Sequence, residues 1–225
     1  MKPVTFKSTC QAFTLIELLV VMVIIGVMLA MLLPASHKSG KASTIVCMNN
    51  LKQVGLGLMM YASDHADHFP WQLSTNSAVT GEAMERRTAA EHFLVLSHYA
   101  FPSSIFVCPT DKARRSATNY SCFHDTNLSY FAALSATVTT GSNVWQLILA
   151  GDQHLSVDGQ PAKPGLCTLN NKSVPGWTEE FHNSDPKVTR GCLLFVDGHV
   201  QFVPAKVLPR LFKNQPVETS RLVIP

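Results

Sequence analysis

The stretch FTLIELLVVMVIIGVMLAMLLPA, residues 13–35, decides what the rest of the chain can be. Its single charged residue is Glu17, and no charge occurs from Leu18 to Ala35. A helix rises about 1.5 Å per residue, so this uncharged part would extend roughly 27 Å. The hydrocarbon core of a bilayer is ~30 Å thick. The sequence therefore predicts a helix that resides in a membrane.

The carboxyl group of Glu17 distinguishes this segment from a simple anchor. An acidic side chain within a membrane span is unfavourable by about 2.5 kcal/mol or more, so it normally has a partner or a function. A cut between Ala12 and Phe13 would place a new α-amino group one helical turn from Glu17. Such amino groups and carboxylates in neighbouring copies could neutralise one another where water is scarce. The alternative is a carboxylate that lies among the lipid headgroups.

Residues 12–17, AFTLIE, follow the short leader MKPVTFKSTCQ. Together they resemble the class III signal of type IV prepilins and type II secretion pseudopilins. The resemblance implies that a prepilin peptidase, which usually cuts after Gly, cleaves after Ala12 and that Phe13 is N-methylated. It also implies that Glu17 is needed for assembly and that Pro34 kinks the helix. A secretory signal peptide is the competing interpretation, but its apolar region spans only about 7 to 15 residues.

The chain divides at this segment. We expect a prepilin leader at 1–12, a transmembrane and assembly helix at 13–35, an amphipathic continuation at 36–62, and a globular periplasmic head at 63–225. The continuation is predicted from apolar residues spaced three and four apart, which are Ile45, Met48, Leu51, Gly55, Leu58 and Ala62. One helix from 13 to 62 would be about 75 Å long. Its second half would pack on the head.

The net charge indicates which partners the protein can have, and the cysteines indicate the redox compartment in which it resides. The formal net charge of +3 includes Lys2 and Lys7 of the leader, so the rest is near neutral and no nucleic-acid partner is predicted. Five of the six cysteines lie beyond the apolar segment without a CxxC pair: Cys47, Cys108, Cys122, Cys167 and Cys192. Because zinc sites usually contain close-set pairs, scattered cysteines favour disulfides in an oxidising compartment. We predict a Cys47–Cys108 disulfide; a buried reduced thiol is the alternative, above all for Cys192.

The remaining pattern predicts an α+β head in which the amphipathic helix packs on a small antiparallel sheet, as in pilins. We expect a helix at 81–99, a short strand at 104–109, one or two strands within 119–136 and a strand at 143–152. Residues 156–180, rich in proline and glycine, are expected to form a surface loop. Residues 191–203 predict a hairpin with a type I′ turn at Asp197-Gly198. The tail from 204 is expected to pack at most along an edge.

Parts of the head also resemble the type II secretion pseudopilin-like group. The segments are CMNNLKQVGLGLMMYASD at 47–64, FP at 69–70, FVCP at 106–109, and an H…DG box formed by His182, Asp197 and Gly198. The interval from His182 to Asp197 is longer than the usual nine residues of that box. The resemblance implies a structural filament subunit in the bacterial inner membrane, single-pass, with its head in the periplasm or on the filament. Implied partners are other pilin or pseudopilin subunits, prepilin peptidase, an inner-membrane assembly platform and membrane lipid.

The rival interpretation is a membrane-anchored periplasmic metal-binding or hydrolytic domain. Its candidate ligands supply nitrogen and oxygen; they are Asp152, His154, His182, Asp197 and His199. Local structure explains several of them equally well, because Asp197 suits a turn, Asp152 begins a loop and His199 would face outward. No GxSxG, HExxH, P-loop or dinucleotide motif occurs. We therefore expect no enzymatic activity, no catalytic residue and no metal or other cofactor.

Overall fold

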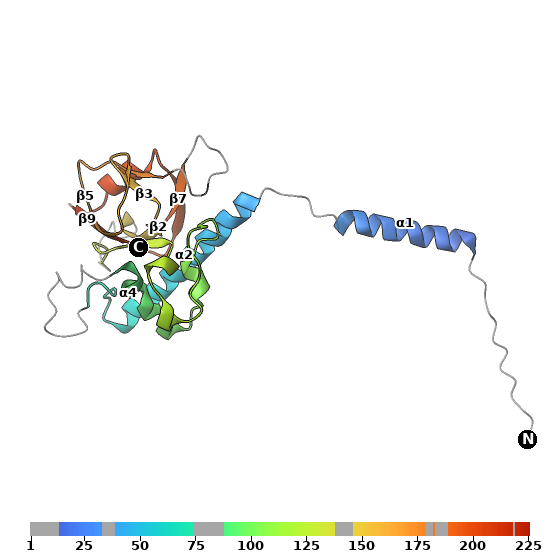
Figure 1. Ribbon diagram of the computed structural model, residues 1–225, viewed down its shortest axis with the longest axis horizontal. Helices are drawn as coiled ribbons and strands as arrows, with labels where there is room; N and C mark the ends of the chain where they lie inside the picture. The colour runs from blue at the N-terminus through green and yellow to red at the C-terminus, as the bar shows by residue number, and fades with distance from the viewer. Residues whose placement is uncertain are drawn as a thin grey trace, which may run out of the picture. The chain divides into compact units, whose positions relative to one another are not determined.

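The computed structural model describes residues 14–32, 39–73, 88–137, 146–178, 182, 189–217 and 219–225. The chain forms two compact units, Met1–Lys38 and Ser39–Pro225 (Figure 1). Ala12, Phe13 and Pro34 lie outside the described residues, as does the leader. The predicted cleavage point, methylation site and kink therefore remain predictions.

Helix α1 (Leu15–Leu32) is the described element of the first unit. At its start the Thr14 backbone N–H donates to the Glu17 carboxylate at 2.9 Å and the Glu17 backbone N–H donates to Thr14 Oγ1 at 3.4 Å, which is the reciprocal pattern of a capping box. The Thr14 hydroxyl group also donates to the Glu17 carboxylate, at 2.8 Å. The apolar side chains from Leu15 to Leu29 are exposed. Within the described residues no helix is long and apolar enough to cross a membrane, so the predicted membrane span is not supported there.

Helix α2 (Ser39–Asp64) opens the second unit. One face is buried at a spacing of three and four residues, through Cys47, Leu51, Val54, Leu58 and Ala62. This confirms the predicted amphipathic helix, although Ile45 is exposed and does not belong to the buried face. The predicted single helix from 13 to 62 crosses residues 33–38, which lie outside the described part of the chain.

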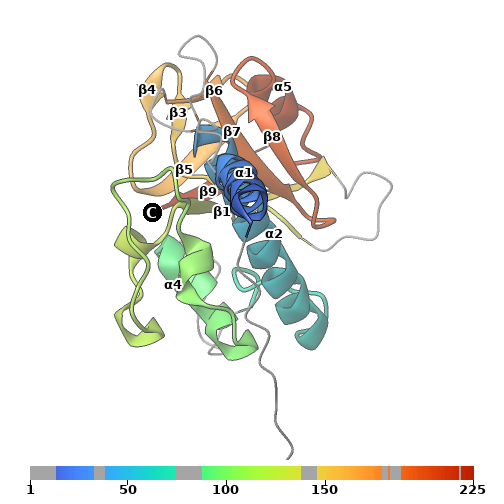
Figure 2. The ribbon, with the colours of Figure 1, turned by 90° about the vertical axis from the view of Figure 1, so that its right-hand side faces the viewer.

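A six-stranded sheet forms the centre of the head, in the order β5-β9-β1-β2-β7-β8. Every neighbouring pair is antiparallel. The strands are β1 (Tyr130–Ala133), β2 (Ile148–Asp152), β5 (Gly165–Asn170), β7 (Arg190–Phe195), β8 (Val200–Pro204) and β9 (Thr219–Ile224). Helix α2 contacts β2, β7 and β8 (Figure 2). The head is therefore α+β with an antiparallel sheet, as predicted.

Glycine allows α2 to lie close to this sheet. A Cβ atom at Gly55 would lie 2.7 Å from Cδ1 of Leu194 on β7, too near for any side chain without movement. A Cβ atom at Gly57 would lie 2.9 Å from the ring of Phe101. The two glycines weaken the isolated helix by about 1 kcal/mol each relative to alanine. In return they permit the close approach of α2 to its neighbours.

Residues 155–177 correct the prediction of a surface loop. They contain β3 (Leu155–Val157), β4 (Gln160–Pro161), β5 and β6 (Pro175–Trp177). Strands β4, β3 and β6 form a second sheet in that order. Asp158 and Gly159 both have positive φ, 52° and 80°, and they link β3 to β4 as a two-residue type I′ turn. The glycines and prolines here separate short strands instead of marking one long loop.

The hairpin of β7 and β8 confirms the predicted element but not its turn. Phe195 N–H donates to His199 O at 3.0 Å, which leaves three residues in the loop, and of these only Gly198 has positive φ. This is a three-residue loop with a left-handed glycine, not a type I′ turn. The physical reason is Val196, which is buried and donates its backbone N–H to Leu147 O at 2.9 Å.

The segment between α2 and β1 contains α4 (Ala89–Leu94) and four 3₁₀ turns, η1 (Val95–Tyr99), η2 (Ser103–Phe106), η3 (Tyr120–Cys122) and η4 (Asp125–Asn127). The helix predicted at 81–99 is confirmed only over Ala89–Leu94, because Thr88 is an extended N-cap and a 3₁₀ turn follows Leu94; residues 81–87 lie outside the described residues. The strand predicted at 104–109 is wrong. Val107 N–H instead bonds to Ser104 O at 3.3 Å, and the Asn50 side chain of α2 donates to Val107 O at 3.1 Å.

The residues after Pro204 also correct the prediction. They form α5 (Leu208–Lys213) and β9, and β9 pairs with β1 on one side and β5 on the other. Leu222, Val223 and Ile224 are buried. This part of the chain therefore lies inside the main sheet and not along an edge.

Candidate functional site

The N-terminal site is described only in part. Glu17 lies in the first turn of α1, and its carboxylate accepts the two hydrogen bonds from Thr14. Its side chain is exposed within this unit, as are the apolar side chains of the following turns. The arrangement leaves a carboxylate at one end of an uncovered apolar helix, where it can meet a positive group of another molecule.

The five residues of the rival metal site lie at three separate places in the head. Asp197 Oδ1 bonds to the ring of His199 within the exposed hairpin turn, and His199 faces outward as predicted. His154 Nε2 lies 3.9 Å from Asp111 Oδ2. The remaining two, Asp152 and His182, lie together in the interior of the head. The H…DG box is likewise divided, because His182 is buried whereas Asp197 is exposed.

A buried cluster of possible metal ligands surrounds Asp152 and His182. One donor atom from each of Cys47, Asp152, His182 and Cys192 lies within 4.8 Å of every other. The fold explains the convergence: Cys47 is on the buried face of α2, Asp152 ends β2, and Cys192 lies on β7, the strand next to β2. His182 approaches from between β6 and β7, with its backbone at a φ of 53°.

The carboxylate of Asp152 is the centre of this cluster. Its Oδ2 accepts the backbone N–H of Cys192 at 2.6 Å and lies 3.2 Å from Nε2 of His182. Its Oδ1 accepts from Sγ of Cys47 at 3.6 Å. A buried carboxylate is unfavourable unless it is paired and hydrogen-bonded. These three contacts meet that requirement without solvent.

Cys108 is a fifth member at the margin of the cluster. Its Sγ lies 3.6 Å from His182 Nε2 and 2.9 Å from Oγ1 of Thr110, and it is hydrogen-bonded to Cys47. The predicted Cys47–Cys108 disulfide is absent, since both thiols are free. The two cysteines do come together, but within a group of several polar side chains. Cys192 is a buried free thiol, which confirms the alternative given for it.

Burial governs the protonation of these groups. It raises the pKa of Cys47 and of Cys108 well above the ordinary thiol value. A hydrogen bond with Cys47 lowers the pKa of Cys192, but burial and the charge of Asp152 raise it, and the net shift is upward. Burial lowers the pKa of His182, whereas hydrogen bonds with Asp152 and Cys108 raise it, to about 9. Without a metal, the thiols are therefore neutral at pH 7 and His182 is a cation.

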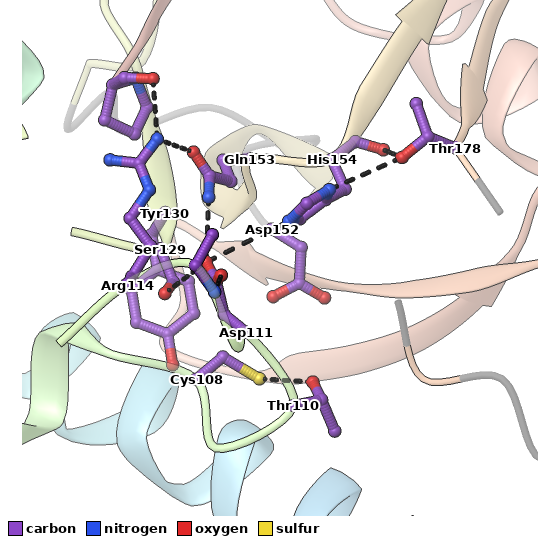
Figure 3. A network of polar contacts seen from close by, with 12 residues as sticks. Cys108, Thr110, Asp111, Arg114, Ser129, Tyr130, Asp152, Gln153, His154 and Thr178 are labelled. Carbon is purple, nitrogen blue, oxygen red and sulfur yellow. Dashed lines mark hydrogen bonds and ion pairs between the residues drawn. The ribbon is translucent and has the colours of Figure 1, made fainter. Parts of the chain in front are cut away.

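A polar network beside the cluster connects the loop that carries Cys108 with the end of β2 that carries Asp152 (Figure 3). The Asp111 carboxylate accepts from the side chains of Ser129 and Gln153, both at 2.8 Å. Arg114 donates to the side chain of Gln153 and to the carbonyl oxygen of Pro225, the latter at 3.0 Å. Because Cys108 and Asp111 share one loop and Asp152 precedes Gln153, the network holds that loop against the end of β2.

The joint site of Cys47 and Cys192 is not predicted by the sequence. Close-set cysteine pairs are the usual sequence signal of a metal site, whereas these two residues are far apart in the chain and meet only through the packing of α2 on the sheet. The sequence does predict that both cysteines are buried, because Cys47 lies on the predicted apolar face of a helix and Cys192 lies within a predicted strand. Neither position by itself indicates a ligand.

Comparisons with known proteins bear on the N-terminal segment. A family model described as the prokaryotic N-terminal methylation motif matches residues 7–33. No curated protein and no solved structure matches the chain. The match covers the second half of the leader, most of the apolar segment and Glu17, and it agrees with the resemblance seen in the sequence. The chain therefore carries a prepilin-like signal, the mark of pilin-like substrates of prepilin peptidase.

Proposed function

We propose that the chain is a structural subunit of a type IV pilus-like or type II secretion filament. It is cleaved after Ala12, methylated at Phe13 and assembled through α1. The observation that carries the proposal is the methylation motif at residues 7–33, with Glu17 near the start of an uncharged apolar helix. The proposal gives the chain a mechanical role and no catalytic activity. Its partners are other subunits, the peptidase, membrane lipid and an inner-membrane assembly platform.

The exposed apolar side chains of α1 provide the surface for assembly. Apolar side chains from Leu15 to Leu29 have no cover within their own unit, and burying them against other copies removes apolar surface from water. Bundled helices bring each Glu17 near the α-amino group of a neighbour's Phe13. A carboxylate and an ammonium ion that are both removed from water stabilise each other strongly when their geometry is good. The pair therefore sets the register between identical helices.

The mature N-terminus gives a direct test. The full chain is produced in a bacterium that contains prepilin peptidase, and its N-terminal peptide is identified by mass spectrometry. We expect a chain that begins at Phe13 and carries one methyl group. An intact Met1, or a cut near Ser36 as for a secretory signal, would contradict the proposal.

A second test separates processing from assembly. Glu17→Gln removes the charge without changing the shape of the side chain, and we expect it to be cleaved but absent from sheared filaments. Asp67→Asn is the matched control, because it makes the same change on an exposed head residue in a left-handed conformation that Asn tolerates. Filaments formed equally well by Glu17→Gln and by the control would exclude the proposed pairing.

A further inference from the structure

We propose that Cys47, Asp152, His182 and Cys192 bind one zinc ion in the interior of the head. The proposal is independent of the filament function, because a metal centre would stabilise this domain whatever the chain assembles into. All four residues are at least 94% buried, and their donor atoms lie within 4.8 Å of one another. Two thiols, an imidazole and a carboxylate in one apolar interior form a set of metal ligands.

The distances fit a tetrahedral ion. With Zn–S of about 2.3 Å and Zn–N or Zn–O of about 2.0 Å, neighbouring ligand atoms lie roughly 3.5 Å apart. Cys47 Sγ and Asp152 Oδ1 are 3.6 Å apart, and Cys192 Sγ and His182 Nε2 are 4.0 Å apart. His182 Nε2 and Asp152 Oδ2 are 3.2 Å apart. The four donor atoms lie within 4.8 Å of one another, so the widest pair would have to close by up to about 1 Å to complete the site.

Neighbouring groups orient two of the ligands. Oγ1 of Thr44 lies 3.2 Å from Nδ1 of His182, so a proton held on Nδ1 would leave the lone pair of Nε2 directed at the metal. The Cys192 backbone N–H holds Asp152 Oδ2 at 2.6 Å. The ring of Phe202 meets His182 edge-on, with centroids 5.6 Å apart. Such outer contacts are characteristic of metal sites, where they fix the ligand that the ion requires.

The ligand types select the ion. Thiolates and imidazole favour zinc over calcium or magnesium, which prefer oxygen ligands. Four buried protein ligands form a closed site, which is typical of structural zinc and not of catalytic zinc with its open position. Cys108 lies next to the site, 3.6 Å from His182 Nε2, and we assign it to the surroundings of the metal because its Sγ is bonded to Thr110.

Binding exchanges protons for the ion. Zinc is held by Cys47 and Cys192 as thiolates and by His182 as a neutral imidazole, so binding displaces the protons that these groups would otherwise hold. Zinc affinity therefore rises with pH.

The test measures metal on the full chain purified in detergent. We expect about one zinc per chain after dialysis against trace zinc, as for a closed structural site. Replacement by Co²⁺ should give thiolate-to-cobalt charge-transfer absorption. Cys47→Ser and Cys192→Ser should abolish both signals, whereas the matched controls Cys122→Ser and Cys167→Ser, which alter cysteines outside the cluster, should keep them. A chelator should lower the melting temperature of the parent and leave that of Cys192→Ser unchanged, which separates loss of metal from loss of fold.

Three results would overturn the assignment. The first is a folded parent chain without zinc that takes up none when it is added under reducing conditions. The second is a zinc content that persists in the Cys47→Ser and Cys192→Ser double variant. The third is a disulfide between two of Cys47, Cys108 and Cys192, found by peptide mapping of chain isolated from the periplasm without reductant. Loss of zinc in Cys108→Ser with retention in Asp152→Asn would overturn the carboxylate as the fourth ligand.

Discussion

His182 and Asp152 form a fully buried ion pair, with Nε2 and Oδ2 3.2 Å apart and neither side chain exposed. The two residues come from different parts of the head, because Asp152 ends β2 whereas His182 lies between β6 and β7. A contact of this kind ties His182 to the centre of the main sheet. It also places the imidazole where it can exchange its carboxylate partner for a metal ion.

Removing one member of this pair should be strongly destabilising. We expect His182→Ala, measured without metal, to lower the free energy of unfolding by about 3–5 kcal/mol, because Asp152 is left as a buried charge without its cation. Urea unfolding in the presence of a chelator measures the loss. The control is His199→Ala, which breaks the exposed pair with Asp197 and should cost about 1 kcal/mol or less. Equal losses in both variants would contradict this account of the buried pair.

Gly151, one residue before Asp152, should not tolerate a side chain. A Cβ atom there would lie 2.6 Å from Leu193 Cδ2 and 2.7 Å from Cζ of Phe131, both in the core. We expect Gly151→Ala to lower the free energy of unfolding by about 1–3 kcal/mol through overpacking. Gly55→Ala should cost less, because the gain in helix propensity of about 1 kcal/mol offsets its contact with Leu194. Chemical denaturation of the two variants side by side tests the order.

The turn at Gly198 predicts a difference between two substitutions. Gly198 has a φ of 83° and open space around its Cα, so the backbone alone limits what fits there. Gly198→Ala should lower the free energy of unfolding by roughly 1–2 kcal/mol, the strain of a left-handed residue. Gly198→Asn should lose less, because Asn tolerates this region. Thermal unfolding of both variants provides the measurement, and a larger loss for Asn would show that side-chain packing, not φ, limits the site.

Asp111 should make the head sensitive to acid. Burial raises the pKa of this carboxyl, but the neighbouring His154 and the hydrogen bonds from Ser129 and Gln153 lower it by more, so the net pKa is below the ordinary 3.8. A lowered pKa in the folded state gives stability that is fully present above the unfolded value and is lost as the pH falls through the folded one.

The effect can be isolated by substitution. We expect the free energy of unfolding of the parent to fall more steeply below about pH 4 than that of Asp111→Asn, which cannot titrate at this position. Urea unfolding between neutral pH and pH 3 measures both slopes. Asp67→Asn, an exposed change, should keep the steep parental slope. Identical slopes in the parent and Asp111→Asn would assign the acid sensitivity to other groups.

Local periodicity accounts for the parts of the fold that the sequence could predict. The buried face of α2, strand β2 and the hairpin of β7 and β8 each repeat a pattern within a few residues, and each is present in the structure. The Asp-Gly dipeptide shows the limit of this approach. Asp158-Gly159 forms the type I′ turn that was predicted at Asp197-Gly198, because a hydrogen bond from the neighbouring Val196 to Leu147 gives the second hairpin a longer loop.

Long-range pairing accounts for what the sequence did not predict. Strand β9 has no strong alternation of its own and is defined by its two neighbours, β1 and β5. The buried cluster depends on the same kind of information, because β2 and β7 must become adjacent before Asp152 can meet Cys192. The place of β9 and the meeting of Asp152 with Cys192 depend on how the whole sheet is paired, and no short sequence motif indicates them.

The position of β9 also determines how the head responds to cutting. Loss of residues 219–224 would detach β5 from the other four strands of the main sheet, and β1 and β5 would each present a bare row of backbone donors and acceptors. Such rows recruit strands from other molecules. A protease that nicks the chain after α5 would therefore convert this domain into a seed for aggregation instead of leaving a shortened, folded remnant.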